Sequence, residues 1–282
     1  MAARCYHSGL SIGPVDANAS RAILPPWRAL VVSAHPDDIE YGCAGTVAKW
    51  TDEGAHVTYC IVTDGSTGTQ DRDLVGERLA EVRREESVHA AAVVGVQDIE
   101  WLGYPDGYVA YSLDLRRDLA RVFRRLRPHR YVVMDPASTI DGFVNHPDHR
   151  AVGQASLDVT VTAGTTPGHF PELLGEGLEP WRGLRELWIM GPGAKPEASD
   201  ISATIGRKIE ALLCHRSQMG DDAGRIAELM RNATSEAGRS HGYAHAETFQ
   251  VIAQRPEPGV EEDGPGSGPA PGPDPATPGG GA

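Results

Sequence analysis

Short apolar segments alternate with helical patterns along most of this 282-residue chain. Five segments are typical of buried strands: residues 29–34, 56–63, 99–102, 130–134 and 187–190. Apolar residues recur at helical spacing in three others, 75–94, 115–126 and 201–213, and a further helix is expected after His149. This alternation predicts an α/β fold, with a mostly parallel sheet and helices on both of its faces. Binding sites in such sheets lie at the carboxyl ends of the strands.

The charge balance excludes several classes of partner. The chain has 26 Lys and Arg against 39 Asp and Glu, so its formal net charge is −13 and it is a poor partner for nucleic acid or anionic membranes. No segment approaches the roughly 20 apolar residues of a membrane span, and a signal peptide is not expected. The four cysteines are scattered and Cys60 lies in a predicted strand, so we expect free thiols. These features predict a cytoplasmic enzyme with a small substrate.

Composition divides the chain into three parts. Residues 1–27 have no clear periodicity, and a variable surface arm is favoured there over a substrate lid. Residues 28–255 form the predicted catalytic domain. Residues 256–282 contain eight Pro and eight Gly. Such a segment buries too little apolar surface to offset the entropy lost on ordering, so we expect a disordered tail.

Two short His/Asp motifs follow predicted strands. Residues 35–38 have the sequence His-Pro-Asp-Asp directly after the first strand, and residues 146–149 have the sequence His-Pro-Asp-His beyond the strand at 130–134. The proline of each motif fixes φ and stiffens the loop. Two His and one Asp form a typical catalytic zinc shell with one position left for water. The alternative is a pair of turns in which Asp38 caps a helix, but the position of both motifs after strands favours a metal site.

The chain resembles the PIG-L/LmbE-type family of zinc-dependent N-acetylglucosaminyl deacetylases. The resemblance depends first on residues 34–38 and 146–149, and it extends over residues 29–250. Shorter matching segments lie at 42–46, 62–65, 83–96, 102–107 and 215–218. The resemblance implies a Rossmann-like, three-layer α/β/α fold with a mostly parallel sheet, the LmbE-like fold.

The same resemblance implies a role for each polar residue of the two motifs. The implied zinc ligands are His35, Asp38 and His149. Iron(II) or another divalent metal could take the place of zinc, because availability as well as affinity decides which metal is bound. Asp37 is the implied general base that accepts a proton from the attacking water. His146 is implied to stabilise the oxyanion and then protonate the leaving amine, with Asp148 orienting it.

Three further residues are candidates for substrate binding. The resemblance places Arg83 and Asp106 at positions that contact the sugar or its aglycone. Asp64 lies in the glycine-containing loop 63–69, which we expect to form a wall of the site. Arg83 has an alternative role as a helix-surface ion pair with Glu86, and Asp106 has one as an ordinary turn residue.

Two positions in the matching region have no assigned chemistry. Some relatives have a tyrosine that assists the oxyanion near Val144, and valine cannot donate a hydrogen bond. His215 lies in a segment that recurs in the family, but a structural role at the end of a helix is at least as well supported.

The expected function is that of a metal-dependent hydrolase that removes acetate from the 2-acetamido group of a small molecule containing N-acetylglucosamine. Two alternatives are open: a metal-dependent amidase acting on a thiol–sugar conjugate, and a non-catalytic sugar-binding protein with a degenerate site. The expected partner is a small-molecule glycoside. The sequence leaves the aglycone and a homo-oligomeric state open.

Overall fold

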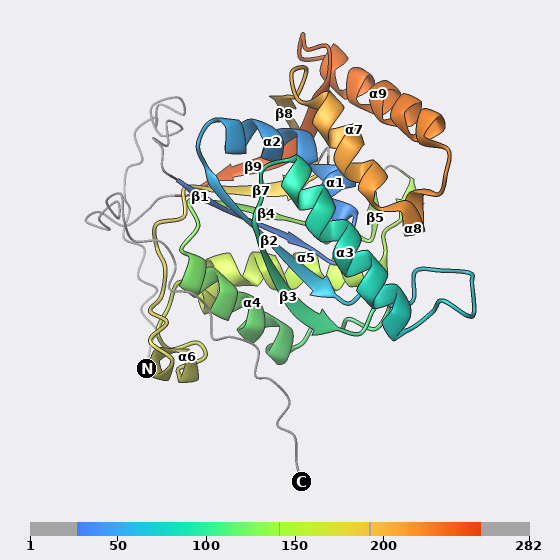
Figure 1. The fold of residues 1–282 in the computed structure, drawn as a ribbon. Coiled ribbons are helices and arrows are strands. Elements are labelled where there is room, and N and C mark those ends of the chain that lie inside the picture. The colour runs from blue at the N-terminus through green and yellow to red at the C-terminus, as the bar shows by residue number, and fades with distance from the viewer. Residues whose placement is uncertain (1–26, 141, 192, 255–282) are drawn as a thin grey trace, which may run out of the picture.

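The computed structural model describes residues 27–140, 142–191 and 193–254. Its centre is a seven-stranded sheet in the order β3-β2-β1-β4-β7-β9-β8 (Figure 1). The strands are β1 (Arg28–Ser33), β2 (His56–Thr63), β3 (Asp98–Tyr104), β4 (Arg130–Val133), β7 (Glu186–Met190), β8 (Glu197–Asp200) and β9 (Ala246–Ala253). The first five are parallel to one another, and β9 runs antiparallel between β7 and β8. The expected mostly parallel sheet is confirmed.

Helices cover both faces of this sheet (Figure 1). One layer consists of α2 (Ala44–Asp52), α3 (Glu77–Val93), α7 (Ile205–Cys214) and α9 (Ala223–Arg239), and α7 contacts the other three. The opposite layer consists of α4 (Leu113–Leu126) and α5 (Pro147–Asp158), which continues into a π-helical turn at Val159–Ala163. The remaining elements are short: α1 (Asp38–Gly42), α6 (Glu172–Gly175), α8 (Arg216–Met219), and the hairpin of β5 (Thr139–Ile140) and β6 (Phe143–Val144). The architecture is the predicted three-layer α/β/α arrangement.

The central strands and α4 form for the reasons that the sequence suggests. β1 and β2 are buried along nearly their whole length, as expected for apolar strands covered by helices on both faces. In α4, the predicted apolar face is buried: Leu115, Leu119, Val122 and Leu126. The helix begins after Ser112, whose hydroxyl accepts a hydrogen bond from the main-chain N–H of Leu115 at 3.1 Å.

The C-terminal elements α9 and β9 are not predicted from the sequence patterns. β9 carries Glu247, a charged residue that is only 4% exposed. Its carboxylate pairs with Lys208 of α7, Oε1 to Nζ, at 2.7 Å. Because the partner comes from a distant element, hydropathy along the segment does not indicate that this position is buried.

The connections place both His/Asp motifs at one edge of the sheet. β1 lies between β2 and β4. The chain therefore continues from β1 to β2 and β3 on one side and then returns to β4 on the other side. The carboxyl ends of β1 and β4 therefore flank a topological switch point, where ligands bind in open α/β sheets. A close approach of α5 to the loop after β4 requires Gly153, because a Cβ there would lie 2.5 Å from the carbonyl oxygen of Met134.

The ends of the predicted catalytic domain differ slightly from the expectation. Trp27, assigned above to the N-terminal arm, is 2% exposed and packs edge-on against Trp50, with ring centroids 5.4 Å apart. The rest of the arm and the tail at 256–282 lie outside the described residues. Within the described ranges, Cys43, Cys60 and Cys214 are free thiols, as predicted. None of the helices described is long and apolar enough to span a bilayer.

Candidate metal centre and active site

The first motif forms a tight turn between β1 and α1. Asp37 has a φ of 104°, a left-handed conformation that is unfavourable for a residue with a side chain. The next residue, Asp38, begins α1, and its Oδ2 accepts a hydrogen bond from the main-chain N–H of His35 at 2.7 Å. The turn therefore directs the two carboxylates differently: Asp38 turns back to His35, while Asp37 points to other partners.

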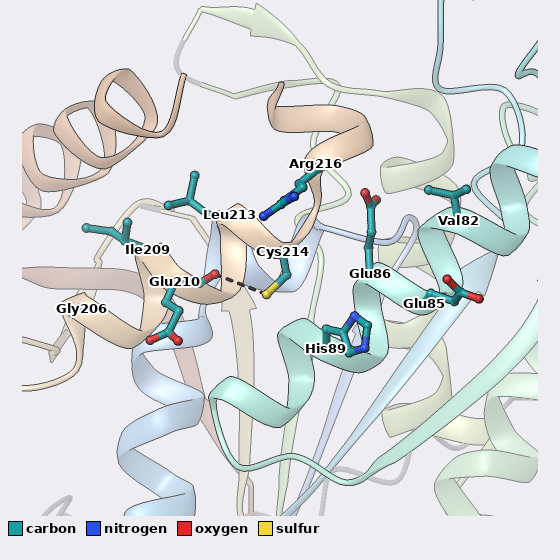
Figure 2. Close-up of a pocket in the computed structure, with 10 residues that line it drawn as sticks. All are labelled: Val82, Glu85, Glu86, His89, Gly206, Ile209, Glu210, Leu213, Cys214 and Arg216. Carbon is teal, nitrogen blue, oxygen red and sulfur yellow. Dashed lines mark hydrogen bonds between the residues drawn. The ribbon is translucent and has the colours of Figure 1, made fainter. Parts of the chain in front are cut away.

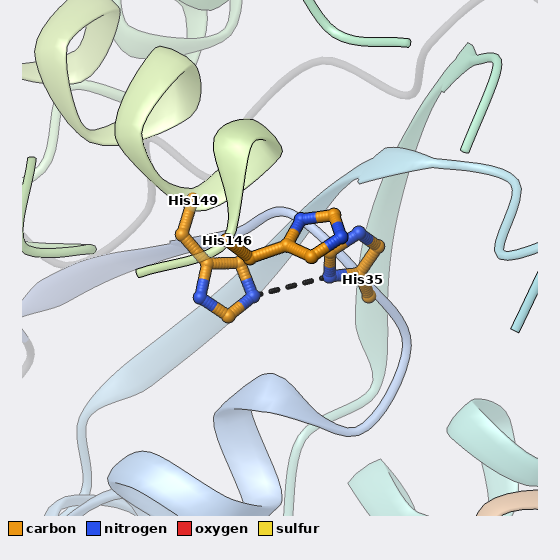
Figure 3. A group of neighbouring side chains, drawn as sticks. All are labelled: His35, His146 and His149. Atoms are coloured by element: carbon orange, nitrogen blue, oxygen red, sulfur yellow. Dashed lines mark hydrogen bonds between the residues drawn. The ribbon is translucent and has the colours of Figure 1, made fainter. Parts of the chain in front are cut away.

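The second motif brings His149 to the first. Nε2 of His149 lies 3.2 Å from Nδ1 of His35 and 3.1 Å from Oδ1 of Asp38 (Figure 3). Oδ2 of Asp38 lies 3.4 Å from Nδ1 of His35. A tetrahedral zinc with ligand bonds of about 2.0–2.1 Å requires ligand atoms roughly 3.3 Å apart. Nδ1 of His35 and Nε2 of His149 therefore have a spacing that suits one divalent cation, and Asp38 presents a different oxygen to each of them.

Two carboxylates hold the other side of the His35 ring. Nε2 of His35 lies 3.1 Å from Oδ1 of Asp106 and 3.2 Å from Oδ2 of Asp148, so it donates towards them and leaves Nδ1 for a metal. Burial lowers the pKa of His35, but its hydrogen bonds with Asp106, Asp148 and Asp38 outweigh burial and raise the pKa to about 11. The surroundings of this imidazole therefore strongly favour positive charge, whether a proton or a metal cation supplies it.

Other groups of side chains also bring metal-ligating atoms close together. Within the described residues, His35, His146 and His149 form one such group and His35, Asp106 and Asp148 form a second, with ligand atoms within 4.8 Å of one another in each. Asp148 is already bound by the main-chain N–H groups of Gly107 and Val109, at 2.7 and 3.1 Å. These hydrogen bonds give Asp148 a supporting role, and they leave His35 and His149, with either Asp38 or His146, as the candidate metal shell.

Asp37 is placed and tuned as a base. Burial raises the pKa of its carboxyl, the charge of Asp38 raises it further, and Arg83 lowers it, so that the pKa lies at about 7. Oδ2 of Asp37 lies 3.3 Å from Nη2 of Arg83. A carboxylate with a pKa near the working pH is suited to accept a proton during catalysis.

Arg83 is a buried residue of α3, and its guanidinium donates hydrogen bonds to main-chain carbonyl groups. Its side chain is 3% exposed; Nη2 donates to the carbonyl of Pro36 at 2.5 Å and Nη1 to the carbonyl of Gly65 at 3.1 Å. The alternative of a surface ion pair with Glu86 is wrong, because Glu86 accepts hydrogen bonds from Ser217. Arg83 thus links the turn after β1 to the loop after β2 and holds Asp37 between them.

Asp106 and Asp64 lie beside the site with their oxygens engaged. Besides His35, Asp106 accepts a hydrogen bond from the N–H of Thr67 at 3.0 Å. Oδ1 of Asp64 accepts from the N–H groups of Ser66 and Asp106, at 3.0 and 3.2 Å. These carboxylates therefore hold the loop 63–69 against the segment that follows β3.

His146 lies at the mouth of the site, ahead of α5. The ring centroids of His146 and His35 are 4.8 Å apart, and the three histidine rings face one another (Figure 3). The expectation that the carboxylate of Asp148 orients this ring is not met, since that carboxylate is bonded to His35 and to main-chain N–H groups. Asp148 holds His146 through its main chain instead: its N–H donates to Nδ1 of His146 at 3.2 Å. Burial, followed by the positive charge of His35, lowers the pKa of His146.

A buried polar network behind α1 is missed by the sequence analysis. Nζ of Lys208 donates to the carbonyls of Glu40 and Tyr41, at 3.0 and 2.6 Å, and pairs with Glu247. His215 is fully buried, with Nε2 3.1 Å from Oε2 of Glu40. His215 therefore joins this network through Nε2, and its Nδ1 is buried without a hydrogen-bond partner. No local sequence pattern identifies this network, because its members come from α1, α7 and β9.

Two cavities differ sharply in their relation to this site. The larger, of about 680 Å³, lies between α3 and α7 and contains none of the predicted site residues (Figure 2). A second cavity, of about 360 Å³, has Asp38 and His149 in its wall. The candidate active site therefore opens into the smaller cavity, whose volume lies within the usual range for small-molecule sites.

Fold and site together define the class of protein: an α/β protein with a centre of two His and one Asp at the switch point of its sheet. The PIG-L family model, described as GlcNAc-PI de-N-acetylase, matches residues 30–160. Diacetylchitobiose deacetylase from Thermococcus kodakarensis is 30% identical over 226 residues, covering 80% of this chain and 83% of the relative. The chain belongs to the PIG-L family.

Further relatives agree with this assignment. The 1D-myo-inositol 2-acetamido-2-deoxy-alpha-D-glucopyranoside deacetylase from Streptomyces avermitilis is 28% identical over 270 residues, covering 86% of each chain. The solved structure of N,N'-diacetylchitobiose deacetylase from Pyrococcus horikoshii matches with a TM-score of 0.75 and 31% identity, covering 81% of this chain and 85% of that one. The resemblance inferred from the motifs is confirmed.

Proposed function

We propose that this protein is a metal-dependent hydrolase that removes acetate from the 2-acetamido group of a small molecule containing N-acetylglucosamine. The observation that carries the proposal is that Nε2 of His149 lies 3.2 Å from Nδ1 of His35 and 3.1 Å from Oδ1 of Asp38. Asp37 follows His35 closely in the same turn and supplies a carboxyl with a pKa of about 7. The substrate class is supported by the activities that the names of the relatives state.

The residues present fit zinc, the metal expected from the sequence. A divalent cation, when bound, lowers the pKa of a coordinated water and polarises a carbonyl. His35, Asp38 and His149 would hold the cation, and the carboxylates behind His35 would keep its ring in the required orientation. Iron(II) would suit the same ligands, so the identity of the metal as zinc is itself proposed.

The remaining steps fall to side chains of the chain itself. Asp37 would accept the proton of the attacking water, and Arg83 would keep its carboxyl in position. Because Nδ1 of His146 accepts the N–H of Asp148, the neutral ring carries its proton on Nε2. From Nε2 it would donate a hydrogen bond to the developing oxyanion, and Asp37, which has taken the proton of the water, would pass that proton to the leaving amine.

Arg83, Asp106 and Asp64 were expected to bind substrate directly, and the geometry favours a different role. Asp64 and Asp106 accept hydrogen bonds inside the chain, and both terminal nitrogens of Arg83 donate to main-chain carbonyls, while its Nε is buried without a partner. We therefore propose that Arg83 positions Asp37, that Asp106 positions His35 and that Asp64 shapes the loop wall.

The test measures acetate release after the purified protein has been stripped with a chelator and reloaded with zinc. The panel contains N-acetylglucosamine, N,N'-diacetylchitobiose, N-acetylglucosaminyl inositol and a larger amide of a thiol–sugar conjugate. We expect zinc-dependent acetate release from at least one acetamido sugar. Cleavage of the larger amide alone would favour the amidase alternative, and no product from any compound with zinc bound would refute the proposal.

Asp37→Asn separates an enzyme from a sugar-binding protein. Loss of the general base should lower kcat by about 100- to 10,000-fold while zinc content measured by elemental analysis stays the same. Asp98→Asn is the matched control, because Asp98 is an exposed carboxylate at the amino end of β3, away from the motifs. Equal activity of both variants would exclude the proposed role of Asp37.

A further inference from the structure

The cavity beside the metal centre has a largely apolar far end. Its volume is about 360 Å³, and Asp38 and His149 form the end nearest the metal site. The apolar lining comes from four elements or their flanks: Met134 after β4, Ile140 of β5, Met190 of β7, and Met230, Ala233 and Ala237 of α9. Methionine side chains adapt their shape to apolar guests, and three of them line this space.

Several of the polar groups in the cavity wall are already bonded within the chain. Lys208 has three hydrogen-bond partners, and Glu247 accepts from Lys208, Gly45 and Thr46. Nδ2 of Asn145 donates to the carbonyls of Asp135 and Ala137, and the hydroxyl of Thr234 to the carbonyl of Met230. These four side chains therefore have their bonded atoms committed to the chain, and the remaining polar side chains of the wall are Tyr41, Asp135 and Thr248, beside the expected metal ligands.

The size of the cavity exceeds what the reacting group needs. An acetyl group presents a single methyl to its surroundings, and most of a 360 Å³ space would stay unused. Asp37, Arg83 and Asp106, which form the polar side of the site, do not line this cavity. The site thus has a polar side and an apolar side, with the metal ligands between them.

We infer that this cavity binds an apolar substituent of the substrate, so that the natural substrate carries an alkyl or aryl group next to its acylated glucosamine. The inference rests on the proposed function, because the metal ligands fix where the amide is cleaved. The apolar group could belong to the aglycone or to the acyl chain, since both extend from the same sugar.

Two substrate series distinguish these sources. The first varies the aglycone of N-acetylglucosamine from methyl to butyl to hexyl, and the second varies the acyl chain of methyl glucosaminide from acetyl to butanoyl to hexanoyl. Burial of a methylene contributes about 0.8 kcal/mol, so kcat/KM should rise by up to about fourfold per methylene in one series. A rise in the first series assigns the cavity to the aglycone, and a rise in the second assigns it to the acyl chain.

Variants of α9 residues test whether the cavity causes the dependence of kcat/KM on chain length. Ala233 and Ala237 lie one helical turn apart and both line the cavity. Leucine fits a helix well at either position and fills the space, so Ala237→Leu should lower the ratio of hexyl to methyl kcat/KM by about tenfold or more. Asn232→Leu is the matched control, because Asn232 is an exposed residue of the same helix outside the cavity wall, and it should leave that ratio unchanged.

The binding affinity of the amine products tests the inference without any catalytic turnover. Calorimetric titration of the zinc protein with methyl, butyl and hexyl glucosaminide, and with the corresponding fatty acids, should show affinity rising with chain length in one set. Hydrolysis with no dependence on chain length in either series would overturn this inference and leave the proposed function intact. Affinities independent of chain length would overturn it even if no substrate is cleaved, and would mean that something other than the substrate fills the cavity.

Discussion

The buried ion pair behind α1 should control the stability of the protein. Lys208 is 1% exposed, and its ammonium lies 2.7 Å from Oε1 of Glu247. It also donates to the carbonyls of Glu40 and Tyr41 at the end of α1. Lys208→Met keeps most of the volume of the side chain but removes the cation, which leaves the Glu247 carboxylate buried without its charged partner.

The structure sets the size of the effect. Removing one partner of a buried ion pair lowers the free energy of unfolding by about 3–5 kcal/mol. In a domain of this size each kcal/mol changes Tm by about 2–4 °C, so we expect a decrease of roughly 6–20 °C. Glu247→Gln in addition removes the unpaired charge, and its single amide oxygen can keep the hydrogen bonds from Thr46 but not the one from Gly45 as well. The double variant should therefore recover about half of the loss.

Thermal unfolding followed by circular dichroism at a fixed zinc concentration measures these changes. The control is Arg239→Met, which breaks an ion pair with Glu236 in which both side chains are about 70% exposed. Exposed pairs of this kind contribute about 1 kcal/mol or less. The reasoning is refuted if Lys208→Met changes Tm no more than Arg239→Met does, or if the double variant is less stable than Lys208→Met.

Three more predictions concern the active site and its support. Arg83→Met removes a positive charge that lowers the pKa of Asp37, so this pKa should rise and the acidic limb of the pH profile of kcat/KM should move to higher pH. Arg83→Lys, which keeps the charge, is measured alongside as the control. An acidic limb that does not move in Arg83→Met would exclude this effect. Zinc at 100 times its Kd should stabilise the metal-free protein by about 2.7 kcal/mol and so increase its Tm. His149→Ala should abolish this increase. The same increase in both proteins would show that zinc binds at another site. Gly153→Ala should lower the free energy of unfolding by about 1–3 kcal/mol in urea titrations, because the new Cβ would lie 2.5 Å from the carbonyl oxygen of Met134, and an unchanged midpoint would contradict that contact.

Much of the fold follows from local patterns in the sequence. β2 (His56–Thr63) has the predicted bounds, and four other strands differ from their predicted ends by at most two residues. β1 and β2 are recognisable because helices cover both sides of them, so almost every residue is buried. The same rule fails for β9, where Glu247 occupies a buried position because Lys208 of another element neutralises it.

As with the fold, part of the candidate site follows from the sequence and part does not. Rigid His/Asp motifs after β1 and β4 predict a metal centre, because parallel strands end at a common edge of the sheet. The partners of each side chain do not follow from the motifs. Asp148 was expected beside His146, but its carboxylate holds His35 and the N–H groups of Gly107 and Val109.

By itself, the sequence determined the layered α/β fold, the edge of the sheet that carries the two His/Asp motifs, and the family, because spacing and residue chemistry are local properties of the chain. Only the tertiary structure decided that Arg83 holds Asp37, that Lys208 and Glu247 support α1, and that an apolar cavity adjoins the ligands. The physical reason is that hydrogen-bond partners and cavity walls come from segments far apart in sequence, and a buried charge is stable only where such a partner reaches it.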